Sequence, residues 1–76
     1  MDNGIFIEKC KDILEKRGIK RESIFVVWSC KTLQNNKAIL SSTIKGAPLF
    51  EITHNGDKGE IYVDTYTKES NECIKA

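Results

Sequence analysis

The chain has 76 residues, three cysteines and a formal net charge of +1. This length allows one domain, residues 1–76, with one small core, and the near-neutral charge does not fit a duplex DNA binder, which carries a general basic excess. The charge is unevenly distributed, because residues 23–50 carry three lysines and no acidic residue, whereas residues 51–76 carry three basic and six acidic residues. The positive middle suits an anionic ligand or the acidic end of a second copy.

The N-terminal segment predicts a helix. Asp2 and Asn3 are favourable N-cap residues, and Gly18 is a favourable residue just after a helix C-terminus. Apolar side chains recur between them at helical spacing, at Phe6, Cys10, Ile13 and Leu14. These side chains would share one face of the helix and pack against a sheet.

Four strands are predicted after the helix, at Ile24–Cys30, Ala38–Ile44, Leu49–Thr53 and Glu60–Thr67. The first is apolar on both faces, which favours a central place in the sheet or a cover supplied by another chain. A short C-terminal helix with Ser70, Cys73 and Ile74 is a further option. The predicted fold class is α+β, with an N-terminal helix packed on a four-stranded antiparallel meander.

The first hairpin turn is predicted at Asn35-Asn36, because asparagine tolerates the positive φ of a type I′ turn. This turn would set Lys31 opposite Leu40. It would also place Phe25 and Trp28 on opposite faces of the sheet.

The second hairpin is predicted to close with a four-residue loop at Asn55–Lys58, which sets Ile52 opposite Ile61. The tighter Asn55-Gly56 turn would oppose two glutamates, whose like charges repel. On the strand that follows the loop, three side chains would then point away from the Ile61 face: Tyr62, Asp64 and Tyr66.

Polar side chains without a carboxylate gather at the predicted tip of the first hairpin. They are Lys31, Thr32, Gln34, Asn35, Asn36 and Lys37. Lysines bind phosphate as point charges, amides form directional hydrogen bonds, and Trp28 offers a stacking plane if it is exposed. The tip therefore predicts a site for an anionic, nucleotide-like molecule. The alternative is that the asparagines only form the turn, the lysines are solvated, and Trp28 belongs to the core.

Two other groups of residues could form a catalytic site or a metal site, but each also has a structural explanation. Cys30 and His54 could act as a thiol and its base, but they belong to different hairpins, which favours a structural thiol. Asp57, Glu60 and Asp64 could hold a divalent cation, but solvated charges on a turn and a sheet face are the favoured explanation. His54 is the only histidine and there is no CxxC pair. We therefore expect no enzyme activity, no metal and no cofactor.

The sequence also bears on location and assembly. No N-terminal apolar run has the length of a signal peptide, and no segment approaches a membrane span. The three cysteines are far apart, odd in number and without metal-type spacing, so together with the missing signal peptide they indicate a cytoplasmic protein with reduced thiols. A chain this small, with apolar surface left over, is expected to form a homo-oligomer.

The run VVWSCKTLQNNKAIL at residues 26–40, followed by NGDKGEIYVDTY at residues 55–66, resembles a family of small phage and prophage proteins of Gram-positive bacteria that has no assigned function. The resemblance covers residues 24–67 and supplies no site residues. It implies a viral gene product acting in the host bacterial cytoplasm. In that context two functions are expected: countering host immunity by sequestering a small nucleotide-type signalling molecule, or inhibiting a host protein by direct binding.

Overall fold

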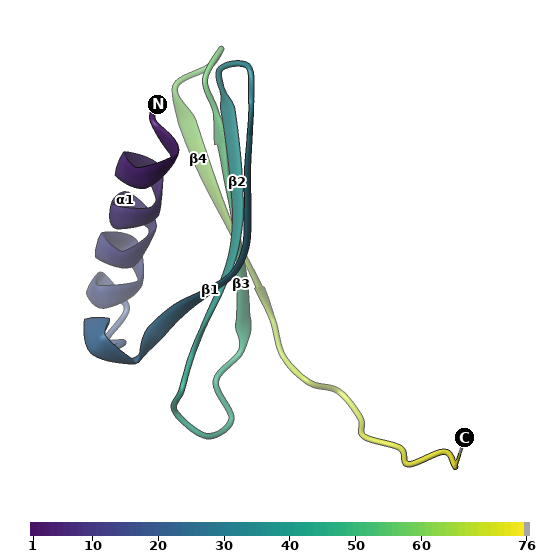
Figure 1. Ribbon diagram of the computed structural model, residues 1–76. Coiled ribbons are helices and arrows are strands. Elements are labelled where there is room, and N and C mark those ends of the chain that lie inside the picture. The colour runs from purple at the N-terminus through teal and green to yellow at the C-terminus, as the bar shows by residue number, and fades with distance from the viewer. Residues whose placement is uncertain (76) are drawn as a thin grey trace.

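The computed structural model describes residues 1–75 and has the predicted α+β architecture (Figure 1). Helix α1 (Asn3–Lys16) is followed by a short 3-10 helix, η1 (Arg21–Ser23). The four strands are β1 (Ile24–Thr32), β2 (Asn35–Ser42), β3 (Leu49–Asn55) and β4 (Glu60–Tyr66). They form one antiparallel sheet in the order β1-β2-β3-β4. Since α1 covers only one side, the sheet has a helix face and an open face.

Helix α1 begins and ends as its sequence predicts. The side chain of Asp2 accepts a hydrogen bond from the Ile5 amide at 3.1 Å, which satisfies one of the free amides of the first turn. After the last turn, Gly18 adopts a φ of 92°, which glycine tolerates without strain. Of the four apolar residues assigned to the packing face, Phe6, Cys10 and Leu14 are fully buried, and Ile13 is half-buried.

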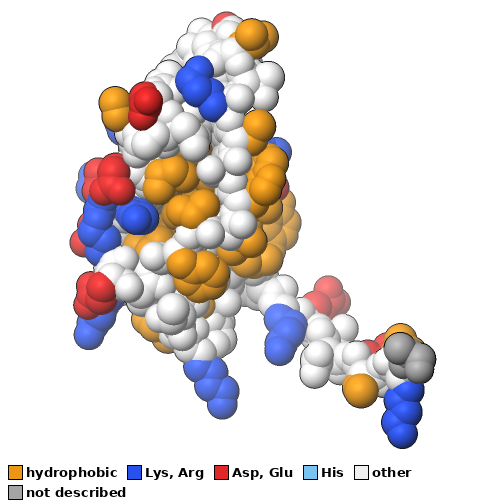
Figure 2. Space-filling view, in the orientation of Figure 1, with side chains coloured by type: hydrophobic (Ala, Val, Ile, Leu, Met, Phe, Trp, Pro, Cys, Tyr) orange, Lys and Arg blue, Asp and Glu red, His pale blue; other side chains and the backbone are white. Residues whose placement is uncertain are grey.

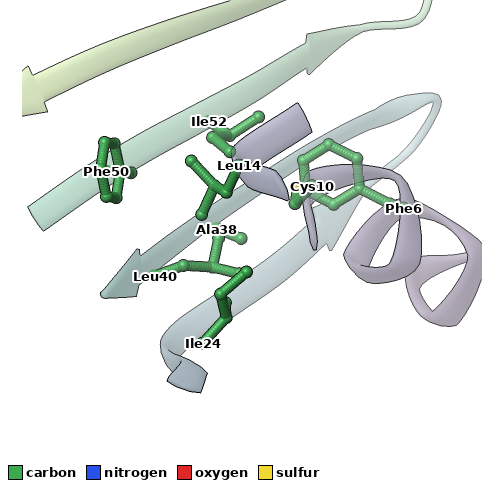
Figure 3. Close-up of a cluster of buried hydrophobic side chains, with 8 residues drawn as sticks. All are labelled: Phe6, Cys10, Leu14, Ile24, Ala38, Leu40, Phe50 and Ile52. Carbon is green, nitrogen blue, oxygen red and sulfur yellow. The ribbon is translucent and has the colours of Figure 1, made fainter. Parts of the chain in front are cut away.

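The core lies between α1 and the first three strands (Figure 3). Eight buried residues form it: Phe6, Cys10, Leu14, Ile24, Ala38, Leu40, Phe50 and Ile52. Strand β4 adds only Ile61 and Val63, which are partly buried against this cluster. The core is therefore centred on β2 and β3 and thins toward β4.

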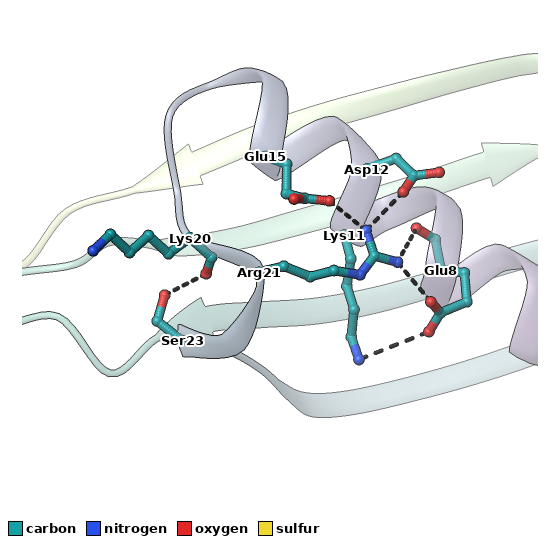
Figure 4. A network of polar contacts seen from close by, with 7 residues as sticks. All are labelled: Glu8, Lys11, Asp12, Glu15, Lys20, Arg21 and Ser23. Atoms are coloured by element: carbon teal, nitrogen blue, oxygen red, sulfur yellow. Dashed lines mark hydrogen bonds and ion pairs between the residues drawn. The ribbon is translucent and has the colours of Figure 1, made fainter.

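Arg21 of η1 ties the end of the helical region to α1 (Figure 4). Its guanidinium donates to Asp12 Oδ1 at 2.7 Å, to Glu8 Oε1 at 2.6 Å and to Glu15. These carboxylates hold the pKa of Arg21 above its ordinary value, chiefly through the hydrogen bond to Asp12. One side chain thus gathers three carboxylates from successive turns of α1 and fixes where β1 leaves the helical region.

The first hairpin turns at Leu33-Gln34 rather than at Asn35-Asn36. Lys31 consequently lies opposite Asn36 instead of Leu40. The physical reason is that Asn36 is needed inside the molecule. It is 1% exposed, its Nδ2 donates to the Met1 carbonyl at 3.2 Å, and its Oδ1 bonds His54 Nδ1 at 3.0 Å. The exposed Leu33 takes the positive φ, 56°, that the tight turn requires.

Strand β1 contains a β-bulge that changes the face of the sheet to which its later side chains point. The pairing shifts between Val26, opposite Leu40, and Trp28, opposite Ile39. The extra residue brings Phe25 and Trp28 onto the same face, whereas the regular alternation of a strand predicts opposite faces. Both side chains lie on the open face.

The second hairpin has the predicted four-residue loop, but one position later, at residues 56–59. Ile52 therefore pairs with Val63 rather than Ile61. A shift of two in the pairing keeps every side chain on its expected face. As predicted, β4 presents three side chains on the open face: Tyr62, Asp64 and Tyr66.

Two further expectations differ from the structure. Residues 67–75 contain neither helix nor strand, so the optional C-terminal helix is not formed there, and Ala76 lies outside the described residues. Strand β1 forms an edge of the sheet and not its centre. The explanation of its apolar faces by a central position is therefore wrong, and cover by another chain stays a prediction.

Candidate functional site

A shallow pocket of about 240 Å³ lies on the open face, where β1, β2 and β3 run side by side. It is lined by Trp28, Cys30, Thr32, Asn35, Asn36, Lys37 and Thr53. The register explains this grouping, because Cys30, Lys37 and Thr53 form one row of paired residues across the three strands. Trp28 and Thr32 lie in the rows on either side of it.

Four of the seven predicted site residues bring their side chains into this pocket. Trp28, Thr32, Asn35 and Lys37 occupy open-face positions of β1 and β2. Trp28 is 49% exposed and does not belong to the core, so its indole ring is accessible at the pocket. The alternative of a core Trp28 is therefore wrong.

The other three predicted residues are used differently. The side chain of Asn36 points to the helix face, where it bonds Met1 and His54, and only its backbone is left to line the pocket. Lys31 lies on the helix face as the partner of Asn36, and its ammonium donates to the Leu33 carbonyl. Gln34, in the turn, donates to the carboxylate of Asp57.

Two pocket residues escaped the sequence prediction, Cys30 and Thr53. Alternation along β1 places Cys30 on the same side as Trp28 and Thr32, and that signal is visible in the sequence. The contribution of Thr53 depends on β3 lying beside β2 in a particular register. The thiol of Cys30 lies 3.6 Å from the Thr32 hydroxyl, so the β1 wall of the pocket holds a weak polar pair.

The surroundings of the pocket are less positive than the sequence predicts, because acidic residues from the second hairpin lie close to the first. Lys37 Nζ lies 3.9 Å from Glu51 Oε1, across the β2–β3 pair. Both partners are partly exposed, so this long ion pair is weak and can be exchanged for a better anion. The tip predicted to lack acid thus acquires Glu51 and Asp57 from the second hairpin.

The two hairpin tips are joined beside the pocket by a hydrogen bond between a backbone amide and a side chain. Asn35 Oδ1 accepts a hydrogen bond from the Gly56 amide at 3.0 Å. A side chain at Gly56 would place its Cβ 2.1 Å from the Gln34 carbonyl oxygen, so only glycine allows this approach. The contact holds the pocket wall at Asn35 in a fixed position.

The competing chemical assignments are not supported by the geometry. His54 is buried on the helix face and Cys30 is exposed on the open face, so the two do not form a thiol–base pair. Among residues 1–75, no group of three or more His, Cys, Asp or Glu side chains is placed to hold a metal ion. Within the same residues, no helix is long and apolar enough to cross a membrane.

Fold and site together describe a small α+β protein with one sheet face covered by a helix and a shallow pocket on the other. The chain belongs to a family of unknown function, DUF6275, whose model matches residues 4–76. No curated protein and no solved structure matches it.

Proposed function

We propose that this protein binds a small anionic, nucleotide-type molecule in the open-face pocket and holds it without chemical change. The observation that carries the proposal is the exposed indole of Trp28 in a pocket that Lys37 also lines. An aromatic plane stacks on a base, and a nearby cation attracts its phosphate. A nucleotide presents both groups within one small molecule.

Five of the pocket side chains have a part in this binding mode. A base stacked on Trp28 gains about 1–3 kcal/mol. Lys37 exchanges its 3.9 Å contact with Glu51 for a phosphate oxygen. The hydroxyls of Thr32 and Thr53 and the amide of Asn35 supply directional hydrogen bonds at the rim. Since no nucleophile and base are paired among these side chains, we expect the ligand to be released intact.

The phage context gives this binding a role. The resemblance of residues 24–67 to small phage proteins supports action in the host bacterial cytoplasm. There, a protein that holds a nucleotide signal lowers the free concentration that reaches the signal's receptor. Sequestration of this kind would counter a host immune pathway without catalysis.

Calorimetry against a panel of cyclic and linear nucleotides tests the proposal. We expect binding that weakens about tenfold in Lys37→Ala, because a charge-assisted hydrogen bond contributes about 1.5–3 kcal/mol, and that weakens by a similar factor in Trp28→Ala. Lys31→Ala is the matched control. It removes a lysine six positions away that lies on the opposite face, so binding should be unchanged.

Two further results would complete the test. Ligand recovered after heating the complex should be chemically intact, and affinity should fall modestly with salt because few phosphates are contacted. Absence of heat across the panel would contradict the proposal, and so would equal losses in Lys31→Ala and Lys37→Ala.

A second candidate function is inhibition of a host protein by direct binding. The observation that favours it is the free edge of β1, which is uncharged from Ile24 to Cys30, largely apolar, and could accept a strand from a partner. Under this function, a host protein captured from bacterial lysate would still be captured by Lys37→Ala. It would be lost when a charge is placed on β1.

A further inference from the structure

Strand β1 has the surface of an interface rather than of a free edge. It is nine residues long and pairs only with β2. Four successive apolar side chains in it are more than a third exposed: Phe25, Val26, Val27 and Trp28. Hydrophobic side chains gather both beside α1 and along the opposite side of the sheet in Figure 2. Monomeric proteins usually protect such an edge with charges or a covering segment, and β1 has no charge before Lys31.

We propose that a second copy of this chain pairs antiparallel with β1, joining the two four-stranded sheets into one continuous sheet of eight strands. The two-fold axis stands perpendicular to the sheet beside β1. Both copies of α1 then lie on the same face, and the two open faces become one surface. The backbone groups of β1 that point away from β2 find partners in the second copy.

The charges that flank β1 identify a second copy as the occupant. Glu22 precedes the strand and Lys31 lies near its end, and neither takes part in an ion pair within residues 1–75. In an antiparallel pair, the start of one strand meets the end of the other. The η1 turn with Glu22 therefore lies near the partner's Lys31, and this pair of opposite charges occurs at both ends of the strand pair.

The β-bulge fixes the register of this pairing. An antiparallel pair requires opposed side chains to point to the same face. Phe25 and Trp28 do so, because the bulge brings both to the open face. A register centred between Val26 and Val27 sets Phe25 opposite the partner's Trp28, and it brings the partner's Lys31 past the start of β1, beside the η1 turn that carries Glu22. The shared face of Phe25 and Trp28 selects this register, and the opposite charges at the strand ends agree with it.

The dimer also changes the surroundings of the pocket. Trp28 forms the β1 end of the pocket lining, so the partner's Phe25 would lie immediately beyond it and extend the aromatic wall. The two pockets would lie on one shared surface, on either side of the two-fold axis. The dimer itself depends only on β1 and stands whether or not a nucleotide is the ligand.

Light scattering across a concentration series, with circular dichroism to verify folding, tests the dimer. We expect a dimer at micromolar concentration, and a rise of about a hundredfold in its Kd for Phe25→Lys, because this exposed aromatic lies at the centre of the interface. The matched control is Tyr66→Lys on β4, an exposed aromatic on the same face at the other edge. It should leave the dimer intact.

A charge exchange tests orientation and register. Glu22→Lys should raise the Kd by about tenfold, since it opposes two like charges at each end of the strand pair, and the double variant Glu22→Lys with Lys31→Glu should restore it. A monomer at micromolar concentration overturns the inference. The same holds if the monomer binds a host protein in place of a second copy. A dimer that persists in Phe25→Lys, or that the double exchange does not restore, also overturns it.

Discussion

The two edge strands of the sheet have opposite chemistry. Strand β4 carries Glu60 and Asp64, and between these two residues it alternates between exposed and partly buried positions. Strand β1 carries no charge over its first seven residues and exposes apolar side chains on both faces. A charged, alternating edge resists further strand pairing, and an uncharged apolar one invites it. The contrast teaches that hydrophobicity alone does not distinguish a central strand from an edge that serves as an interface.

The largest expected difference between the two edges is in their contribution to the core. Ile24→Ala in β1 removes a buried side chain and should lower the free energy of unfolding by about 2–5 kcal/mol. Val63→Ala in β4 removes a partly buried one and should cost about 1 kcal/mol. Urea denaturation followed by circular dichroism at one fixed protein concentration measures both. Equal losses would show that β4 carries as much of the core as β1.

The contact between the hairpin tips links the two halves of the sheet, and Gly56→Ala should weaken it. The new Cβ would lie 2.1 Å from the Gln34 carbonyl oxygen, so the loop must move and the hydrogen bond to Asn35 is strained. We expect a loss of about 1–3 kcal/mol, typical of overpacking, seen as a lower thermal midpoint. Lys58→Ala in the same exposed loop is the control and should change little. An unchanged midpoint for Gly56→Ala would mean that the tips are not rigidly joined.

The reactivity of the three cysteine thiols compares the exposed β1 edge with the buried core. Burial raises the pKa of the Cys10 thiol to about 12, so at pH 8 it remains protonated and shielded from reagents. Cys30 on β1 and Cys73 are exposed. A chromogenic disulfide reagent should therefore modify two thiols rapidly in the native protein, and Cys10 only after unfolding. Three thiols reacting at one rate would contradict the buried position of Cys10.

The smallest expected effect concerns the acidic surroundings of β4. The hydrogen bond to Glu60 raises the pKa of Tyr62, and the charges of Glu51 and Asp64 raise that of Tyr66. Both pKa values are raised on folding, so their contribution to stability is complete below the ordinary tyrosine value of about 10 and is lost as pH rises through the folded values. Ultraviolet titration should show both tyrosines ionising late, and Glu60→Gln should move only one of them toward the ordinary value.

The fold was predictable because its signals are local. The cap at Asp2, the terminator Gly18 and the helical spacing of Phe6, Cys10 and Leu14 each act within a few residues. The four strands likewise follow from apolar segments separated by turn residues. These features are sufficient for a helix on an antiparallel meander.

The site was predicted only in part, because its geometry depends on contacts between distant segments. Asn36 has the turn preference expected of asparagine, but its bonds to Met1 and His54 draw it into the interior, and the turn moves to Leu33. That move takes Lys31 out of the site. The bulge after Val26 has no local sequence signal, and the approach of Glu51 to Lys37 requires knowing which strands are neighbours.

The thinning of the core toward β4 has a consequence for synthesis of the chain. All eight core residues lie between Phe6 and Ile52, and the sheet follows chain order. A nascent chain therefore possesses all eight of these core residues once β3 has left the ribosome, before β4 is available. Helix α1 and three strands can collapse at that stage, and β4 then adds to a preformed template. In that order, β3 is briefly the open edge of the nascent sheet, and the arrival of β4 covers it with the strand that carries the charges.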